Sequence, residues 1–445
     1  MKQIYAVPDL LDSSSIAPFQ WRVFILCFLV ALFDGFDTQA IAFTGPAIIQ
    51  AFGLQPGALA PILTAGTLGM VIGAMLLGLV GDKRGRRPTI LGAVALFGLA
   101  TVGTAFAQTT PQILVLRFVA GLGMGGATPL LLSLAAEYGP TRRRGTIMTA
   151  VLLGLPMGAI LGGLLAAQMM PVVGWQGIFL VGGLVPLGLL VVLVFALPES
   201  LHYLARLDTP AGHAKVARLM NRIVAAKLPD DARFNVPGQD VKTRLSSLFS
   251  NRLARNTLAI WTIYLFNWIA WFMLLSWLPT VLKEAGLPHA QAPMGTVAVN
   301  LVFVVCAIPL SMILPKVNTR LLLLGLFLFG IALAVGLAHS ASQWTLVFIL
   351  AGAAGLGIGG QQIVLNYLVA QTYPTALRAT ATGWAIALGR VGAIAGSASG
   401  GWFLEHGGPS GFYLALVMPL LIATLALGLV RPSTQSGSTA PAFGH

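Results

Sequence analysis

The sequence predicts an all-α integral membrane protein with twelve transmembrane helices in two six-helix bundles related by pseudo-symmetry. The first observation is composition: of 445 residues, 57% are hydrophobic and only 9% are charged, whereas a soluble protein carries about 25% charged residues. The second is a series of apolar runs, each of the roughly 20 residues that cross a bilayer. The third is a set of motifs that recurs in the two halves of the chain.

Twelve apolar runs define the expected spans. They cover residues 21–50, 57–80, 88–107, 111–137, 145–168, 174–197, 256–282, 292–314, 320–338, 342–371, 376–404 and 410–430. Gly and Pro punctuate the breaks between them. We therefore expect five units: an N-terminal tail (1–20), a first bundle (21–197), a linker loop (198–254), a second bundle (255–430) and a disordered C-terminal tail (431–445).

The distribution of basic residues predicts the orientation of the chain. Short loops at 83–87 and 142–144, together with the linker, hold most of the cations, whereas Lys283 is the only cation in the loops of the opposite side. By the positive-inside rule, both termini and the linker face the cytoplasm. We expect the linker to carry amphipathic helices on the membrane face, one over 211–227, and we assign it no activity. The net charge of +13 does not indicate nucleic acid binding, because no basic stretch is interleaved with aromatic residues.

The two halves share motifs at one constant offset, which places position 121 opposite position 355. GLGMGG at 121–126 matches GLGIGG at 355–360, PTRRRGT at 140–146 matches PTALRAT at 374–380, and GAILG at 158–162 matches GAIAG at 392–396. Parallel repeats of six spans, with a substrate site between them near the membrane midplane, are typical of alternating-access transporters.

Two acids in the first span, Asp34 and Asp37, give the strongest functional signal. Asp34 lies about 18 Å along the helix from Arg22, near the middle of a ~30 Å hydrocarbon layer. An ionisable group there costs about 2.5–3.5 kcal/mol. The two carboxyls share a helix face, so each disfavours ionisation of the other and burial disfavours both. Such a pair can take up and release a proton. The alternative is a structural pair neutralised by arginines elsewhere in the bundle.

Two arginines also lie within the spans. Arg390 is roughly 21 Å from the cytoplasmic start of span 11, and Arg117 is about 9 Å from the outer start of span 4. A guanidinium offers a planar fork that suits a carboxylate. We expect Arg390 to hold an anionic substrate, with an ion pair to Asp34 or Asp37 as the alternative. Whether Arg117 pairs with span 1 or contacts substrate stays open.

Spans 7 and 10 supply aromatic and amide side chains. Tyr264, Trp268 and Trp271 share one face of a helix, which suits a ring-bearing anion. Trp277 is expected in the interfacial belt or packed toward lipid. Four amide side chains are poorly suited to contact lipid and are expected to face the cavity: Asn267, Gln361, Gln362 and Asn366.

The loop after span 2, GLVGDKRGRR at 78–87, predicts a conformational latch. Glycines are expected to permit a close helix contact and a chain turn, and an acid lies among cations at a helix end, an arrangement that can hold one side closed in one state. The expected members are Gly78, Asp82, Gly85, Arg86, Arg87, Glu137 and Arg144. The alternative is a topology anchor alone. The equivalent PKVNTR at 315–320 lacks the acid and the glycine, so any latch there should be weaker.

This loop resembles the signature of the major facilitator superfamily. Three further motifs are DGFD at 34–37, LRFVAG at 116–121 and GRVG at 389–392. With these motifs and the loop, the chain resembles the aromatic acid:proton symporter family over nearly its whole length. The resemblance implies the major facilitator fold and proton-coupled uptake of a benzoate-like or hydroxylated aromatic acid across a bacterial inner membrane. It also implies that Asp34, Asp37, Arg117 and Arg390 matter.

Other function classes are less favoured. A proton-coupled drug or metabolite exporter is the main alternative, because GLPMG at 154–158 loosely resembles an antiporter motif, but Arg390 argues against it. The repeat with buried charges disfavours a channel or receptor, and the sequence has no phosphate-binding loop of an ATP-driven pump. We expect no enzymatic activity, no cofactor, no metal site and no nucleic acid partner, with Cys27 and Cys306 as small hydrophobes. The expected partners of a functional monomer are protons, an aromatic carboxylate and the lipid bilayer.

Overall fold

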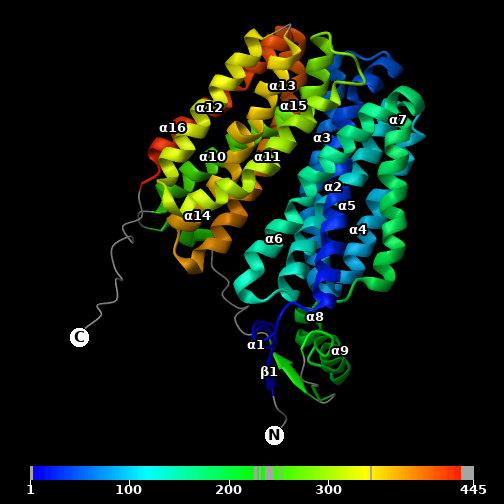
Figure 1. The fold of residues 1–445 in the computed structure, drawn as a ribbon, viewed down its shortest axis with the longest axis vertical. Helices are drawn as coiled ribbons and strands as arrows, with labels where there is room; N and C mark the ends of the chain where they lie inside the picture. The colour runs from blue at the N-terminus through cyan, green and yellow to red at the C-terminus, as the bar shows by residue number, and fades with distance from the viewer. Residues whose placement is uncertain are drawn as a thin grey trace.

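The computed structural model describes residues 4–224, 228–229, 232–235, 245–250, 253–340 and 343–431. Nearly all of these residues are helical, as composition and apolar periodicity predict. The helices form two bundles that lie side by side, one from each half of the chain (Figure 1).

The first bundle contains a helix for each of its expected spans. Its elements are α2 (Pro18–Phe52), the short η1 (Pro56–Ala58), α3 (Leu59–Arg84), α4 (Arg86–Ala105), α5 (Thr110–Tyr138), η2 (Thr141–Arg143), α6 (Arg144–Leu152) and α7 (Gly154–Ala196). Helix α7 contains two spans, because Gly174 breaks it with φ 67° and ψ −176°. That conformation is open essentially to glycine alone.

The second bundle repeats this order. Its elements are α10 (Leu253–Glu284), α11 (Pro293–Ile313), η4 (Leu314–Lys316), α12 (Thr319–His339), α13 (Trp344–Ala354), a π-helical turn (Gly355–Gly359), α14 (Gly360–Thr372), α15 (Thr375–Ala415) and α16 (Val417–Leu429). Helix α15 is broken at Gly408, with φ 61° and ψ −167°. Gly408 is the counterpart of Gly174 at the same offset that relates the sequence motifs.

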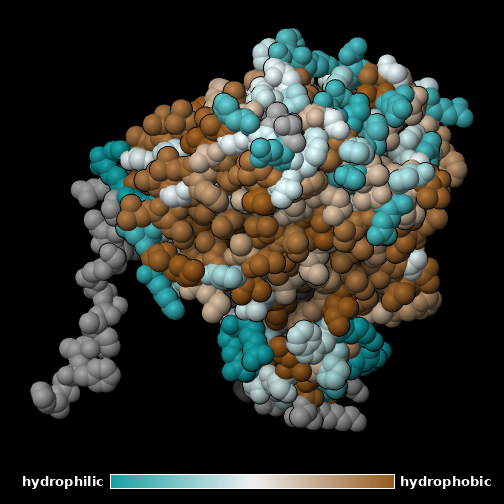
Figure 2. All heavy atoms as spheres, turned by 45° about the horizontal axis from the view of Figure 1, so that its top comes forward, coloured by the Kyte–Doolittle hydropathy of each residue, from teal (hydrophilic) through white to brown (hydrophobic). Residues whose placement is uncertain are grey.

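Length and hydropathy mark the helices as membrane spans. Ten helical segments among the described residues are long and apolar enough to cross a bilayer. Two of them, Thr141–Ala196 and Thr380–Leu429, have 56 and 50 residues, about twice the length that a single crossing needs. Each contains one of the two glycine breaks, so the ten segments correspond to the twelve predicted spans. Hydrophobic side chains cover the middle of the surface in Figure 2, and hydrophilic ones gather toward its ends.

A small unit outside the bundles joins the amino-terminal segment to the linker. It consists of β1 (Ile4–Ala6), α1 (Val7–Asp12), α8 (Leu201–Arg206), α9 (Pro210–Met220) and β2 (Arg233–Asn235). The last linker element, η3 (Leu245–Phe249), packs against the second bundle instead, where Thr257 of α10 donates to the carbonyl of Leu248. Strands β1 and β2 pair in parallel, with Tyr5 opposite Phe234, and Phe234 and Val216 of α9 are buried in the same cluster as the cores of α4 and α5.

This unit was not predicted. The linker packs against the N-terminal segment instead of lying on the membrane face, because the apolar face of α9 is covered by protein. The helix expected over 211–227 ends at Met220, and residues 225–227 lie outside the described part, as does the C-terminal segment from 432 that was expected to be disordered.

The two bundles contact each other at one end of the molecule and diverge toward the other (Figure 1). We call the end with α8 and α9 the proximal end and the opposite end the distal end. At the distal end the backbones come very close: a Cβ atom added at Gly401 would lie 2.9 Å from the Cα of Gly57, and one at Gly163 would lie 2.4 Å from a methyl group of Val297. The structure is therefore closed at the distal end.

Candidate functional site

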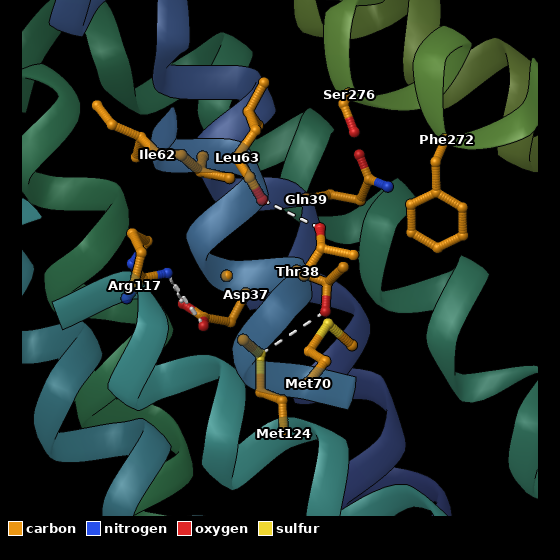
Figure 3. Close-up of a pocket in the computed structure, with 13 residues that line it drawn as sticks. Asp37, Thr38, Gln39, Ile62, Leu63, Met70, Arg117, Met124, Phe272 and Ser276 are labelled. Atoms are coloured by element: carbon orange, nitrogen blue, oxygen red, sulfur yellow. Dashed lines mark hydrogen bonds and ion pairs between the residues drawn. The ribbon is translucent and has the colours of Figure 1, made fainter. Parts of the chain in front are cut away.

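Asp34 and Asp37 are both buried in α2, and both reach toward α5. Asp34 accepts hydrogen bonds from the hydroxyls of Thr128 at 2.5 Å and of Thr38 at 3.3 Å. Both oxygens of Asp37 lie 3.2 Å from the Nη1 of Arg117, which donates to them (Figure 3). The two acids therefore have different surroundings: Asp37 is neutralised by a cation, and Asp34 is held by hydroxyl groups.

Arg117 is engaged inside the first bundle through both of its Nη atoms, whereas its buried Nε has no hydrogen-bond partner among the described residues. Besides Asp37, its guanidinium donates to Thr101 at 2.9 Å and to Thr104 at 3.1 Å, and it lies 4.9 Å above the ring of Phe179. Of the two alternatives that the sequence leaves open, the structure contains the pair with span 1. Sequence reasoning missed the threonines, although Thr101 and Thr104 are three residues apart on one helix face.

Arg390 differs from Arg117 in having no bonded partner. It lies half-buried on α15, and among the described residues it makes no hydrogen bond or ion pair. Its charge and that of Asp34 act on each other across the gap between the bundles. The ion pair that was the alternative to substrate binding is thus not formed, and the fork of the guanidinium is available to an anion.

An aromatic and amide wall begins directly beside Arg390. The indole of Trp268 packs so closely against Gly389 that a Cβ atom there would lie 2.9 Å from the ring. Trp268 donates its N–H to Gln362 at 2.6 Å. Gln362 in turn donates to Asn366 at 3.2 Å, and the hydroxyl of Tyr264 donates to the same Asn366 oxygen at 2.7 Å. Asn366 is exposed; its Oδ1 accepts both of these hydrogen bonds, and its Nδ2 makes none among the described residues.

Other residues expected at this wall lie elsewhere. Asn267 and Gln361 do not face the cavity: they are buried, and they bond each other at 2.5 Å inside the second bundle. Trp271 packs against Phe303 of α11, with ring centroids 5.8 Å apart. The interfacial or lipid-facing position expected for Trp277 is wrong, because its indole is fully buried and donates to the carbonyl of Ser397 at 2.9 Å.

A narrow cavity continues from Asp37 toward the distal end (Figure 3). Gln39 of α2 points across it toward Phe272 and Ser276 of α10. The volume of the cavity is only about 30 Å³, far below the roughly 300 Å³ of the smallest usual ligand pockets. This part of the path between the bundles is therefore shut.

At the proximal end, the predicted loop forms a dense polar network. Arg86 forms an ion pair with Glu137, and Glu137 also accepts a hydrogen bond from Ser200 at 2.5 Å. Glu199 accepts the backbone N–H groups of Arg86 at 2.8 Å and of Arg87 at 3.1 Å. The network ties α4 and α5 to the start of α8, all within the first half of the chain.

A comparison with protein-family models gives a match that covers both halves of the chain, including this loop. The description "Major Facilitator Superfamily" matches residues 27–320 and 261–444. The chain belongs to the Major Facilitator Superfamily. It is a multi-pass membrane transporter and not an enzyme.

Relatives of this transporter are similar over nearly their full length. A gallate transporter of Pseudomonas putida is 36% identical, with 98% of both chains covered. The 4-hydroxybenzoate transporter PcaK of Pseudomonas aeruginosa is 34% identical over 95% of this chain and 94% of its own. A benzoate transport protein of Acinetobacter baylyi is 29% identical, with 96% and 92% covered. The chain is thus a Major Facilitator Superfamily transporter related to aromatic acid transporters.

Solved structures show the same fold. An inward-facing and occupied structure of a bacterial homolog of the human lysosomal transporter Spinster has a TM-score of 0.73 at 14% identity, covering 94% of this chain and 97% of the other. A D-xylose-proton symporter has a TM-score of 0.68 at 20% identity, with 92% and 97% covered.

Within this superfamily transporter, the members of the signature loop have distinct roles. Gly85 turns the chain with φ 100°, and a Cβ atom there would lie 2.5 Å from Glu199. The close helix contact expected at Gly78 is not made, since a Cβ atom there would meet nothing within 4 Å; the approach of α3 to α5 occurs at Gly73 instead. The negative charge of Asp82 attracts Arg86, but Asp82 makes no hydrogen bond or ion pair among the described residues.

Arg144 does not join the ion pairs of this network. Its Nε and one Nη are buried and have no hydrogen-bond partner among the described residues. Nearby, His202 of α8 lies 3.4 Å from Glu137. Burial, together with the positive charges of Arg86 and Arg144, lowers the pKa of His202 from 6.5 to about 4.

Proposed function

We propose that this transporter takes up an aromatic carboxylic acid together with protons, by alternating access between its two bundles. The observation that carries the proposal is Arg390, an unpaired guanidinium beside Trp268 that faces the buried Asp34 across the interface. The guanidinium fork suits a carboxylate, and the adjacent indole suits an aromatic ring. The names of the full-length relatives support the same substrate class.

Asp34 is proposed to carry the proton. Ionised Asp34 attracts Arg390 and repels an incoming carboxylate, whereas protonated Asp34 does neither. A proton on Asp34 therefore strengthens anion binding, and by linkage a bound anion favours the proton to the same extent. In this proposal Asp37 couples the two events, because its pair with Arg117 fixes the position of α2 against α5.

Polar groups of the second bundle are proposed to bind the far side of the ring. Asn366 and Gln362 offer amide groups to ring hydroxyls, and Tyr264 fixes Asn366. Asn267, Gln361 and Trp271 support this wall from inside the bundle.

The proposed location is a bacterial inner membrane with the proximal end in the cytoplasm, because the basic loops gather at that end. The rocking units would be residues 21–197 and 255–430. The structure then corresponds to the state open to the cytoplasm. Arg144, without an ion pair here, is proposed to find its partner when the proximal end closes around the network of Arg86 and Glu137.

The test is uptake of labelled aromatic acids into proteoliposomes with an imposed inward proton gradient. The panel runs from benzoate through hydroxybenzoates to trihydroxybenzoate, with and without protonophore. Empty liposomes at matched pH are the control, because neutral aromatic acids cross bilayers unaided. We expect protein-dependent uptake of at least one acid that the protonophore abolishes. Absence of uptake for every acid, with efflux of a lipophilic cation instead, would establish an exporter.

A further inference from the structure

The two bundles are joined at the distal end by a carboxylate that reaches from one to the other. Glu405 lies on α15 in the second bundle, and its Oε1 accepts the backbone N–H of Gly57 in the first bundle at 2.7 Å. Gly57 belongs to η1, which runs without a break into α3, so that Pro56–Arg84 is one helical stretch of 29 residues. The acid therefore caps the amino-terminal end of a long helix that belongs to the other bundle.

Physical chemistry favours this contact in the closed state alone. The first N–H groups of a helix have no partner within the helix, and their aligned dipoles attract an anion in the first turn. A hydrogen bond to an ionised acceptor is shorter and stronger than a neutral one. Because the effect fades beyond the first turn, separating the bundles by a few ångströms removes it.

The backbone around this contact leaves no space for a side chain at Gly57 or Gly401 while the carboxylate stays in place. A Cβ atom at Gly57 would lie 2.5 Å from the Oε1 of Glu405, and one at Gly401 would lie 2.9 Å from the Cα of Gly57. Two glycines, one in each bundle, thus permit the carboxylate to reach the N–H group.

We propose that Glu405 is a distal gate latch, which stabilises the state closed at the distal end and must release Gly57 each time that end opens. The inference goes beyond the proposed substrate and coupling and needs neither; its test rests only on the proposed orientation, which places the distal end outside the cell. A neighbouring acid provides the contrast. Glu284 lines the same surface depression as Glu405, but its carboxylate bonds Lys283 of its own helix at 2.9 Å and bridges nothing.

The experiment measures how often the distal end opens. Ser276 lines the shut cavity, so a cysteine at this position reacts with a membrane-impermeant thiol reagent added outside spheroplasts only when the distal end opens. The two native cysteines, Cys27 and Cys306, are first replaced by alanine. The modification rate of Ser276→Cys is then proportional to the open population, and no substrate is required.

Glu405→Ala should raise this rate by about threefold, the size expected for an exposed charge at a helix end. Glu405→Gln, which keeps an acceptor but loses the charge, should give a smaller increase. Gly57→Ala should reproduce the effect from the other bundle by displacing the carboxylate, and it provides the test if Glu405→Ala fails to fold. Glu284→Ala should leave the rate unchanged. Equal rates for Glu405→Ala, Gly57→Ala and Glu284→Ala would overturn the latch, whatever the substrate is.

Discussion

Asp34 in the first half and Trp268 in the second occupy equivalent positions at the offset that relates the two sets of motifs. Each bonds the equivalent residue of the fourth span in its own half: Asp34 accepts from Thr128, and Trp268 donates to Gln362. The duplicated scaffold thus presents an acid from one bundle and an aromatic ring from the other at the same depth. The proposed function divides the two tasks in the same way, with the proton on an acid of the first bundle and the ring against an indole of the second.

Asp34→Asn should abolish accumulation driven by the proton gradient. The amide keeps the size of the carboxyl and still accepts from Thr128, but it cannot take up a proton. Exchange of labelled for unlabelled acid at equal concentrations should continue, because exchange needs no net proton movement. Both are measured in proteoliposomes, with Asp9→Asn in α1 as a control that removes a carboxylate outside the membrane. Normal accumulation by folded Asp34→Asn protein would refute the assignment.

Asn366→Leu should change selectivity more than overall activity. The exposed amide of Asn366 is proposed to bond a ring hydroxyl, so its loss should weaken transport of hydroxylated acids by tenfold or more, about 1.4 kcal/mol. Benzoate, which has no hydroxyl, should be transported as well as before or better. The ratio of initial uptake rates for 4-hydroxybenzoate and benzoate is the measurement. An equal loss for both acids would show that Asn366 does not read the hydroxyl.

Arg117→Gln should destabilise the protein strongly, since it leaves the charge of Asp37 buried without a cation. Breaking a buried ion pair from one side costs about 3–5 kcal/mol. The double variant Arg117→Gln/Asp37→Asn should recover part of this loss, because no charge remains uncompensated. Thermal unfolding in detergent measures both. A double variant no more stable than Arg117→Gln would mean that Arg117 acts through packing on Phe179 instead.

Gly408→Ala should cost about 1–3 kcal/mol of stability, because only glycine adopts its backbone conformation without strain. The adjacent Gly407 has no positive φ and open space around its Cβ position, so Gly407→Ala should be neutral or slightly stabilising. Gly174→Ala, at the equivalent break in the first half, should behave like Gly408→Ala, with Gly188→Ala as its control. Unfolding in detergent distinguishes the pairs, and equal effects of Gly407→Ala and Gly408→Ala would contradict the argument.

His202 should make stability fall as the pH drops from about 6.5 to about 4. Its pKa is about 4 in the folded protein, lowered by burial and by Arg86 and Arg144, and about 6.5 when unfolded. The unfolded chain therefore binds more protons in this window, so acid favours unfolding. His202→Gln should flatten that part of the stability profile relative to the unmodified protein. Identical profiles for the two proteins would show that His202 does not titrate between the states.

Much of the fold follows from the sequence because the bilayer limits the solutions. The apolar runs locate every span to within a few residues, and the constant offset between the halves relates Gly174 to Gly408 as well as the motifs. The inward direction of a polar side chain was harder to predict. Asn267 and Gln361 avoid lipid by bonding each other inside the bundle. This contact supplies the hydrogen bonds that their amides need, as a water-filled cavity would.

Tertiary contacts explain the remaining differences. Trp277 is buried because Gly400 and Gly401 of α15 leave room for its indole, a complement that periodicity in α10 alone does not reveal. Short strands such as β1 carry no recognisable pattern, and the partner of β1 lies in the linker, beyond the whole first bundle. The threonines around Asp34 and Arg117 are ordinary helix residues until the acids and the arginine meet.

The pairing of β1 with β2 has a consequence for biosynthesis. Residues 4–6 leave the ribosome long before their partner at 233–235, which is made only after the first six spans have been translated. The pairing of β1 with β2 can therefore form only after the whole first bundle has been translated. Asp12 also bonds the backbone of Thr141, beyond the fourth span. Both contacts of the amino-terminal segment can therefore form only late in synthesis, after the helices that hold their partners have been made.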